Sequence, residues 1–140
     1  MAFTIVVGYD GRPGGRAALD VSLGLAGRMR GTVLFVYVAD EAFDERVGEQ
    51  LREQGEQVTQ GALMAAANHR VRAEALVVAR HDVAEGLVEV AEARCADLLV
   101  VGTHGESPLV GALLGSACHR LVHRTTVPLV VVPWHNGDRA

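Results

Sequence analysis

The sequence predicts an α/β protein whose parallel sheet is covered by helices on both faces. Five short runs of β-branched and aliphatic residues recur along the chain, and segments of helical length separate them. The runs are apolar throughout rather than alternating, which is typical of strands buried on both faces of a parallel sheet. These runs are Phe3 to Tyr9, Thr32 to Val38, Ala73 to Val78, Leu98 to Val101, and Leu129 to Val132.

The first connection, Pro13 to Arg30, has the pattern of an amphipathic helix. Pro13 is tolerated in a first turn, where its missing amide would be unpaired anyway, and Gly31 is a plausible stop. The stripe expected to face the sheet is Ala18, Val21, Leu25 and Met29.

A second helix is expected from about Glu41 to His69. Gly48, Gly55 and Gly61 weaken it, each by about 1 kcal/mol relative to alanine. Its apolar stripe is Phe43, Val47, Leu51, Val58, Ala62 and Ala65. The acidic residues between Asp40 and Glu56 are most simply its solvated face.

Capping signals mark the third helix. It opens at Asp82 with Glu85 three residues later, a variant of the capping box in which two unpaired amides are satisfied reciprocally. The residues at helical spacing after the cap are Val83, Leu87, Val90 and Arg94.

The fourth helix, around Leu113 to Arg124, precedes the last strand. Its apolar face is Leu114, Ala117, Leu121 and Val122, and Thr125 and Thr126 end it. Pro128 and Pro133 bracket the strand that follows, which suits an edge strand because missing amides there cost the sheet little.

The chain has the size and composition of one domain. With 140 residues, 49% of them hydrophobic and only 4% aromatic, it should bury a close-packed aliphatic core. We expect one domain over residues 1–134 and a polar tail over 135–140.

Charge and composition exclude several function classes. The formal charge is −4, and the 13 bases are spread along the chain, so the basic patch of a nucleic-acid binder is missing. All of those bases are arginine. Without lysine, neither Schiff-base chemistry nor a Walker-type phosphate site is possible.

The sequence favours a cytoplasmic protein. Met1 to Asp10 has no basic region before its apolar run and no cleavage site after it, and no later run approaches the ~18 apolar residues of a membrane span. Cys95 and Cys118 lie far apart without a paired motif, so we expect buried, inert thiols in a reducing compartment.

Two strand exits carry unusual glycine-rich sequence. Gly8 to Gly11 follows the first strand, and Gly102 to Pro108 follows the fourth, with Gly115 and Ser116 opening the next helix. Glycine lets backbone amides converge on an anion, and a helix N-terminus adds unpaired amides and a favourable dipole. Together they predict a phosphate cradle that works without lysine. The first-turn glycines do not form the dinucleotide fingerprint, so no NAD or FAD site follows.

The spacing Gly102-x2-Gly105-x9-Gly115-Ser116 resembles the ATP-binding signature of the universal stress protein family. The resemblance covers nearly the whole chain. Supporting motifs are Val6 to Asp10, Tyr37 with its flanking valines, Ala96 to Gly102, and Val127 to Pro133.

This resemblance implies a five-stranded parallel sheet in the order 3-2-1-4-5, with both glycine-bearing exits facing one crevice. It implies ATP, or ADP or AMP, as the ligand, with a divalent cation such as Mg²⁺ able to accompany the phosphates. Asp10 and Val38 would hold the adenosine. Around the ribose and phosphates would lie Val101, Gly102, His104 and Gly105, and the phosphates would rest on Gly115, Ser116 and Ala117.

One position departs from the family pattern. The residue after the second motif glycine is often basic in this family, but here it is Glu106. A carboxylate beside a triphosphate repels it unless the side chain turns to solvent or helps to hold a cation. The departure keeps ADP and AMP open as alternatives to ATP.

Several residues also have simpler interpretations. Asp10 can be a turn residue after a strand. His104 can be a general base or a hydrogen-bond partner, and no catalytic triad is legible around it. His119 and His123 are four residues apart, a spacing that can bind zinc, but without an evident third ligand we interpret them as surface or interface residues.

Three functions remain open from the sequence. The first is a nucleotide-binding stress-response regulator with at most slow hydrolysis. The second is a nucleotide-free dimeric interaction module, since the resemblance implies a homodimer through Leu129 to Val132. The third is a true enzyme, which lacks a visible nucleophile or metal carboxylate pair.

Overall fold

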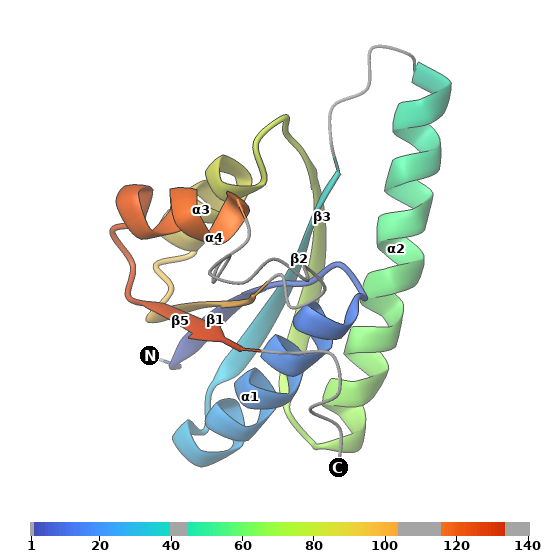
Figure 1. Ribbon diagram of the computed structural model, residues 1–140. Coiled ribbons are helices and arrows are strands. Elements are labelled where there is room, and N and C mark those ends of the chain that lie inside the picture. The colour runs from blue at the N-terminus through green and yellow to red at the C-terminus, as the bar shows by residue number, and fades with distance from the viewer. Residues whose placement is uncertain (1, 40–44, 104–115, 134–140) are drawn as a thin grey trace.

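The computed structural model describes residues 2–39, 45–103 and 116–133. Strands and helices alternate from β1 to β5 (Figure 1). The elements are β1 (Thr4–Gly8), α1 (Pro13–Met29), β2 (Thr32–Ala39), α2 (Glu45–Asn68), β3 (Arg72–Ala79), α3 (Val83–Ala93), β4 (Leu98–Gly102), α4 (Ser116–Arg124) and β5 (Leu129–Val132).

The sheet confirms the predicted fold class and strand order. Its five strands run in the order β3-β2-β1-β4-β5, and every neighbouring pair is parallel. In the register, Val7 of β1 pairs with Phe35 of β2 on one side and Val100 of β4 on the other. All three of these side chains are fully buried, so β1 is the apolar centre of the sheet.

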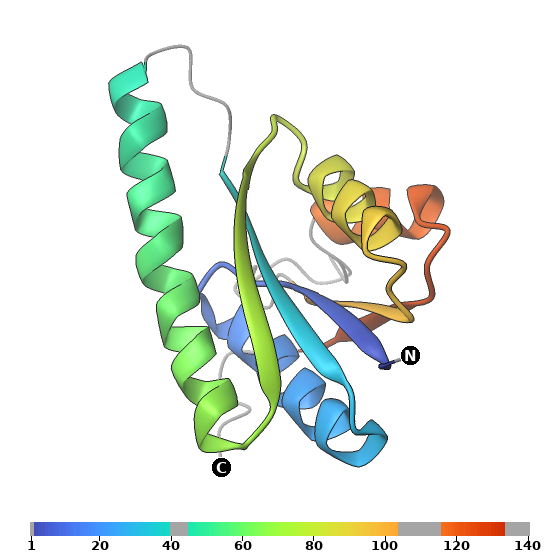
Figure 2. The ribbon, with the colours of Figure 1, turned by 180° about the vertical axis from the view of Figure 1, so that it is seen from behind.

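Helices cover both faces of this sheet. α1 and α2 lie on one face, and α3 and α4 lie on the other, as the two opposite views show (Figures 1 and 2). The first pair buries a cluster around Leu19, Leu23 and Phe35, and the second pair buries one around Leu87 and Leu121. Each central strand therefore contributes side chains to two cores, which explains why its sequence is apolar throughout.

The predicted stripe of α1 has the wrong phase. Ala18 is buried as expected, but Val21 and Met29 are 37% and 51% exposed. The helix turns Leu19, Ser22, Leu23 and Ala26 toward the sheet instead. The small residues on this face let the helix axis approach the strands closely. α1 also stops one residue earlier than expected, because Arg30 adopts the left-handed conformation with φ of 54°.

α2 ends at Asn68, within one residue of the expected end. Its predicted start, from Glu41, falls on residues outside the described ranges. Ala62 is buried on the core side, and Gly55 lies so close to Tyr37 that a Cβ there would be 2.6 Å from its ring. Gly61 faces open space. The three glycines that weaken this helix are therefore not equivalent.

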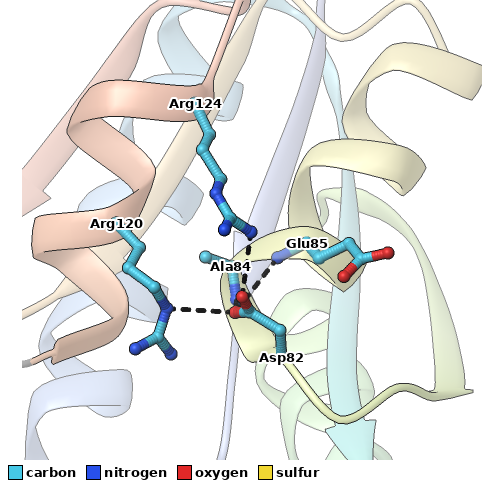
Figure 3. A network of polar contacts seen from close by, with 5 residues as sticks. All are labelled: Asp82, Ala84, Glu85, Arg120 and Arg124. Atoms are coloured by element: carbon cyan, nitrogen blue, oxygen red, sulfur yellow. Dashed lines mark hydrogen bonds and ion pairs between the residues drawn. The ribbon is translucent and has the colours of Figure 1, made fainter.

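The capping residue of α3 is confirmed. Asp82 Oδ1 accepts hydrogen bonds from the backbone N–H groups of Ala84 at 2.9 Å and Glu85 at 3.4 Å. The Glu85 carboxylate points away from Asp82 in Figure 3, so the reciprocal half of the predicted box is not formed. The buried face of the helix is Ala84, Gly86, Leu87, Val90 and Ala91, whereas Val83 and Arg94 are exposed.

Two further expectations need correction. Cys118 is buried as predicted, but Cys95 is exposed, because it follows the end of α3 in a left-handed conformation with φ of 52°. On α4, Leu121 is fully buried, whereas Val122 is 53% exposed and does not belong to the apolar face.

Candidate functional site

A cavity of about 410 Å³ opens at the carboxyl ends of β1, β2 and β4. This volume lies within the range of roughly 300–1,000 Å³ that small-molecule sites occupy. Its wall contains Gly8, Tyr9, Asp10, Arg12, Gly14, Gly15, Val36, Tyr37, Val38, Gln54, Val83, Leu87, Val101, Gly102, Thr103, Ala117, Cys118, Arg120 and Leu121.

Topology explains the position of this cavity. The connection from β1 runs through α1 to β2 on one side of the sheet, whereas β4 pairs with β1 on the other side. α1 and α4, the helices that follow β1 and β4 in the chain, lie on opposite faces of the sheet (Figures 1 and 2). The cavity thus lies where the strand order reverses, which is where open α/β sheets bind ligands.

Five of the residues chosen from the sequence meet in this one cavity. Asp10, Val38, Val101, Gly102 and Ala117 come from four separate segments and all line its wall. His104, Gly105 and Gly115 lie outside the described residues, as does Glu106. Ser116 is the first residue of α4, directly before the cavity-lining Ala117.

Asp10 closes the turn after β1. Its Oδ1 accepts a hydrogen bond from the Arg12 backbone N–H at 2.9 Å. Gly11 in the middle of this turn has φ of +80°, a conformation that favours glycine. The turn function considered from the sequence is thus present, and Oδ2 of the same carboxylate takes no part in it.

The backbone of Gly102 contacts that of Gly14. A Cβ at Gly102 would overlap the Gly14 carbonyl group and lie 3.0 Å from its Cα. Conversely, a Cβ at Gly14 would lie 2.5 Å from the Thr103 carbonyl oxygen. The absence of side chains at both positions brings the first turn of α1 against the end of β4. These glycines therefore fix the floor of the cavity.

A hydrogen bond connects α4 to the end of β4. The Cys118 thiol donates to the Gly102 carbonyl oxygen at 3.2 Å, and Leu121 packs into the core beneath. Ala117, Cys118, Arg120 and Leu121 all line the cavity. The first two turns of α4 thus form one wall of the cavity.

A charged network joins α4 to the start of α3 (Figure 3). Asp82 Oδ1 accepts a hydrogen bond from Arg120 Nε at 3.2 Å, and its Oδ2 accepts one from a terminal nitrogen of Arg124 at 2.9 Å. Burial raises the pKa of the Asp82 carboxyl. The hydrogen bond from the Glu85 amide, the charge of Arg120 and the Ala84 amide together lower the pKa by more than burial raises it, so the net pKa lies below its ordinary value of 3.8.

Sequence reasoning missed several residues of the wall. Tyr37 and Gln54 line the cavity from β2 and α2, and two arginines, Arg12 and Arg120, also belong to its wall. One available signal was overlooked: Arg120 lies four residues after Ser116, and residues at that spacing share a helix face. No sequence signal identifies Gln54, because a glutamine on an exposed helical face is ordinary.

The described cavity wall holds more positive than negative charge. Arg12 and Arg120 are its cations, and Asp10 is its acid.

Elsewhere on α4, the exposed rings of His119 and His123 stack edge to face with centroids 5.1 Å apart. Across residues 2–39, 45–103 and 116–133, no three metal-binding side chains gather. Over the same residues, no helix is both long and apolar enough to cross a bilayer.

Two curated proteins that are similar to this chain are described as universal stress proteins. The universal stress protein Rv1636 of Mycobacterium tuberculosis (strain H37Rv) is 29% identical over 138 residues, which cover 92% of this chain and 94% of the relative. The universal stress protein MJ0531 of Methanocaldococcus jannaschii is 28% identical, covering 91% of this chain and 80% of the relative.

Solved structures share the fold. A universal stress protein family member from Burkholderia pseudomallei superposes with a TM-score of 0.79 at 28% identity, covering 94% of this chain and 96% of that one. Three more distant structures, at 22%, 16% and 15% identity, were solved with cAMP, AMP and dAMP respectively.

The match to a family model extends over almost the entire sequence. That model describes the universal stress protein family and aligns with residues 1–133, which include every strand of the sheet and every element around the cavity. Because the match spans far more than half of the chain, this protein belongs to the universal stress protein family.

Proposed function

We propose that this protein binds an adenine nucleotide, with ATP as the leading candidate, and acts as a stress-response regulator with at most slow hydrolysis. The observation that carries the proposal is the convergence of Asp10, Val38, Val101, Gly102 and Ala117 on one cavity at the reversal of strand order. Residues 1–134 would act as a single nucleotide-binding domain.

The cavity has the mixed character that a nucleotide needs. Val38 and Leu87 offer an apolar surface for a base. Asp10 lies at the end of β1, and its Oδ2, which makes no hydrogen bond within the described residues, can accept hydrogen bonds from ribose hydroxyls. Val38 would contact the adenosine, while Val101 and Gly102, with His104 and Gly105, would flank the ribose and phosphates.

The phosphates would rest at the start of α4. Gly115, Ser116 and Ala117 would surround them, since a helix N-terminus presents unpaired amides and a favourable dipole to an anion. Complexes with cAMP, AMP and dAMP are known among proteins of the same fold. ATP is favoured here because the glycine spacing through Ser116 is intact. Mg²⁺ would accompany the triphosphate, and Glu106 is a residue that could help to hold it.

Two measurements test this proposal. Purified protein is denatured and its extract chromatographed for nucleotide, and refolded or nucleotide-stripped protein is titrated calorimetrically with ATP, ADP and AMP in the presence of Mg²⁺. Binding of one of these ligands is expected. No heat at millimolar concentration of all three would reject the proposal in favour of a nucleotide-free module.

A single substitution tests the phosphate end. Gly115→Val is expected to abolish binding, because a branched side chain would stand where the phosphates lie. Gly27→Val is a suitable control, since Gly27 faces open space on α1, away from the cavity. Unchanged affinity in Gly115→Val would refute the cradle.

The assembly that we propose is a homodimer through Leu129 to Val132. β5 is at one edge of the sheet, and its first three residues are only partly buried. An unpaired edge of apolar residues is a template for pairing with a second copy. Cys95 and Cys118 form no disulfide, which fits a reducing compartment such as the cytoplasm, where we place the protein.

A further inference from the structure

Arg120 occupies a position from which it can reach a bound phosphate. It lies four residues after Ser116 on α4, so the two residues share one face of the helix. It also lines the cavity, and its side chain is 40% exposed. Any anion at the start of α4 therefore has this guanidinium one helical turn away.

The contact with Asp82 holds only one edge of the guanidinium. Nε donates to Asp82 Oδ1 at 3.2 Å. Within the described part of the chain, the two terminal nitrogens of Arg120 make no hydrogen bond or ion pair, and Figure 3 shows them pointing away from the Asp82 carboxylate. A guanidinium held by Nε keeps both terminal nitrogens for a second, bidentate acceptor.

Asp82 is itself a fixed anchor. Its Oδ1 accepts the two backbone amides that cap α3, and the carboxylate is only 22% exposed. The carboxylate cannot follow Arg120 without uncapping the helix. Asp82 therefore restricts the conformations of Arg120, and this lowers the entropy that ordering the side chain on a ligand would cost.

We propose that Arg120 binds the phosphate oxygens of the nucleotide and selects phosphorylated nucleotides over the nucleoside, with Asp82 as its positioning residue. This inference rests on the proposed function. The chain has no lysine, so arginine is its only side chain with a permanent positive charge for binding phosphate. Of the two arginines in the described wall, Arg120 shares a helix with the phosphate-binding residues and is anchored by an ion pair.

The chain offers a matched control. Arg124 lies on the same helix and pairs with the same carboxylate at 2.9 Å, but it is not part of the cavity wall. Arg120→Gln and Arg124→Gln each remove one positive charge and one ion pair to Asp82. Only the first removes a cation from the cavity.

Calorimetric titration of adenosine, AMP and ATP compares the two variants. In Arg120→Gln, ATP affinity should fall at least about tenfold, as for loss of a charged hydrogen bond, while adenosine affinity stays unchanged. In Arg124→Gln, both should change by less than about twofold. Equal ATP affinity in Arg120→Gln and wild type, or an equal loss in the two variants, would overturn the inference.

Wild-type protein separates this inference from the proposed function. Wild type that binds neither ATP nor adenosine rejects both, whereas wild type that binds ATP as tightly as Arg120→Gln rejects only the function of Arg120. Should Arg120→Gln fail to fold, as judged by circular dichroism, Arg120→Lys retains the charge but not the planar fork. That variant should still bind ATP more weakly than wild type, and wild-type affinity would contradict the proposal.

The positioning role of Asp82 has its own readout. Asp82→Asn keeps a capping side chain but removes the charge that anchors Arg120. It should weaken ATP binding in the wild-type background and leave it unchanged in the Arg120→Gln background, because the two substitutions act through one guanidinium. Additive losses in the double variant would show that Asp82 acts by another route.

Discussion

Gly14 and Gly102 touch through their backbones, although they lie 88 positions apart in the sequence. The contact joins the first turn of α1 to the last residue of β4. Both residues line the cavity. Because neither glycine has a side chain, the first turn of α1 and the end of β4 can lie this close together beside the cavity.

Gly102→Ala should both destabilise the fold and open the site. Its Cβ would overlap the Gly14 carbonyl, and backbone cannot yield as a flexible side chain can. We expect a loss of about 1–3 kcal/mol in the free energy of unfolding, the usual range for overpacking. Urea unfolding measures it. Gly27→Ala, which meets nothing within 4 Å, should instead stabilise by about 0.5–1 kcal/mol. Equal stability of Gly102→Ala and wild type would contradict the close contact.

Two glycines of α2 should respond oppositely to alanine. A Cβ at Gly55 would lie 2.6 Å from the Tyr37 ring, whereas Gly61 has open space around it. Gly61→Ala should raise the free energy of unfolding by about 0.5–1 kcal/mol, because alanine favours the helix. Gly55→Ala should lower it by about 1–3 kcal/mol and displace Tyr37 from the cavity wall. Tyrosine fluorescence and urea unfolding report both effects. A stabilising Gly55→Ala would refute this packing.

Sequence reasoning identified what depends on local pattern. The five apolar runs correspond to the five strands. A strand that is buried on both faces of the sheet needs apolar residues along its whole length, and this pattern is visible in the sequence. Asp82 was recognised as a cap, since its chemistry acts within three residues of chain. Asp10 and Gly102 both line the cavity, and the family resemblance implied that the strand ends carrying them face one crevice.

What the sequence did not reveal depends on contacts across the fold. The rotation of α1 is set by how closely small residues let it approach the sheet, and a stripe of mixed alanines and leucines allows more than one phase. The spacing of Arg120 from Ser116 was legible in the sequence, but its ion pair with Asp82 depends on the packing of α3 against α4. Exposure of Cys95 follows from a left-handed backbone at the end of α3, a rare conformation for cysteine.

Asp82 should make stability depend on acidity. The lowered pKa means that the folded state favours the carboxylate, so the stabilisation is complete above the ordinary pKa of 3.8 and is lost as pH falls through the folded-state pKa. Asp82→Asn should be less stable than wild type by about 1 kcal/mol at pH 7, an amount typical of partly exposed ion pairs. This difference should shrink at pH 3.

Urea unfolding at the two pH values measures this difference. Asp20→Asn is the control, because Asp20 is an exposed carboxylate on α1. It should change the free energy of unfolding by less than about 0.5 kcal/mol at either pH. A gap between wild type and Asp82→Asn that is as large at pH 3 as at pH 7 would show that the carboxylate charge is not what stabilises the fold.

Val130→Arg should convert the proposed dimer into a monomer. Val130 lies within the edge strand β5 and is only partly buried, so its substitution reaches the surface at which a second copy would pair. A twofold axis through that surface would bring two arginine side chains together, and their like charges would oppose association. Sedimentation velocity at matched concentration measures the outcome, with circular dichroism to show that the fold persists. Met64→Arg is the control, because Met64 is 63% exposed on α2, which packs against β2 and β3 rather than β5. That variant should sediment as the wild type does, and a Val130→Arg protein that remains dimeric would move the interface away from this strand.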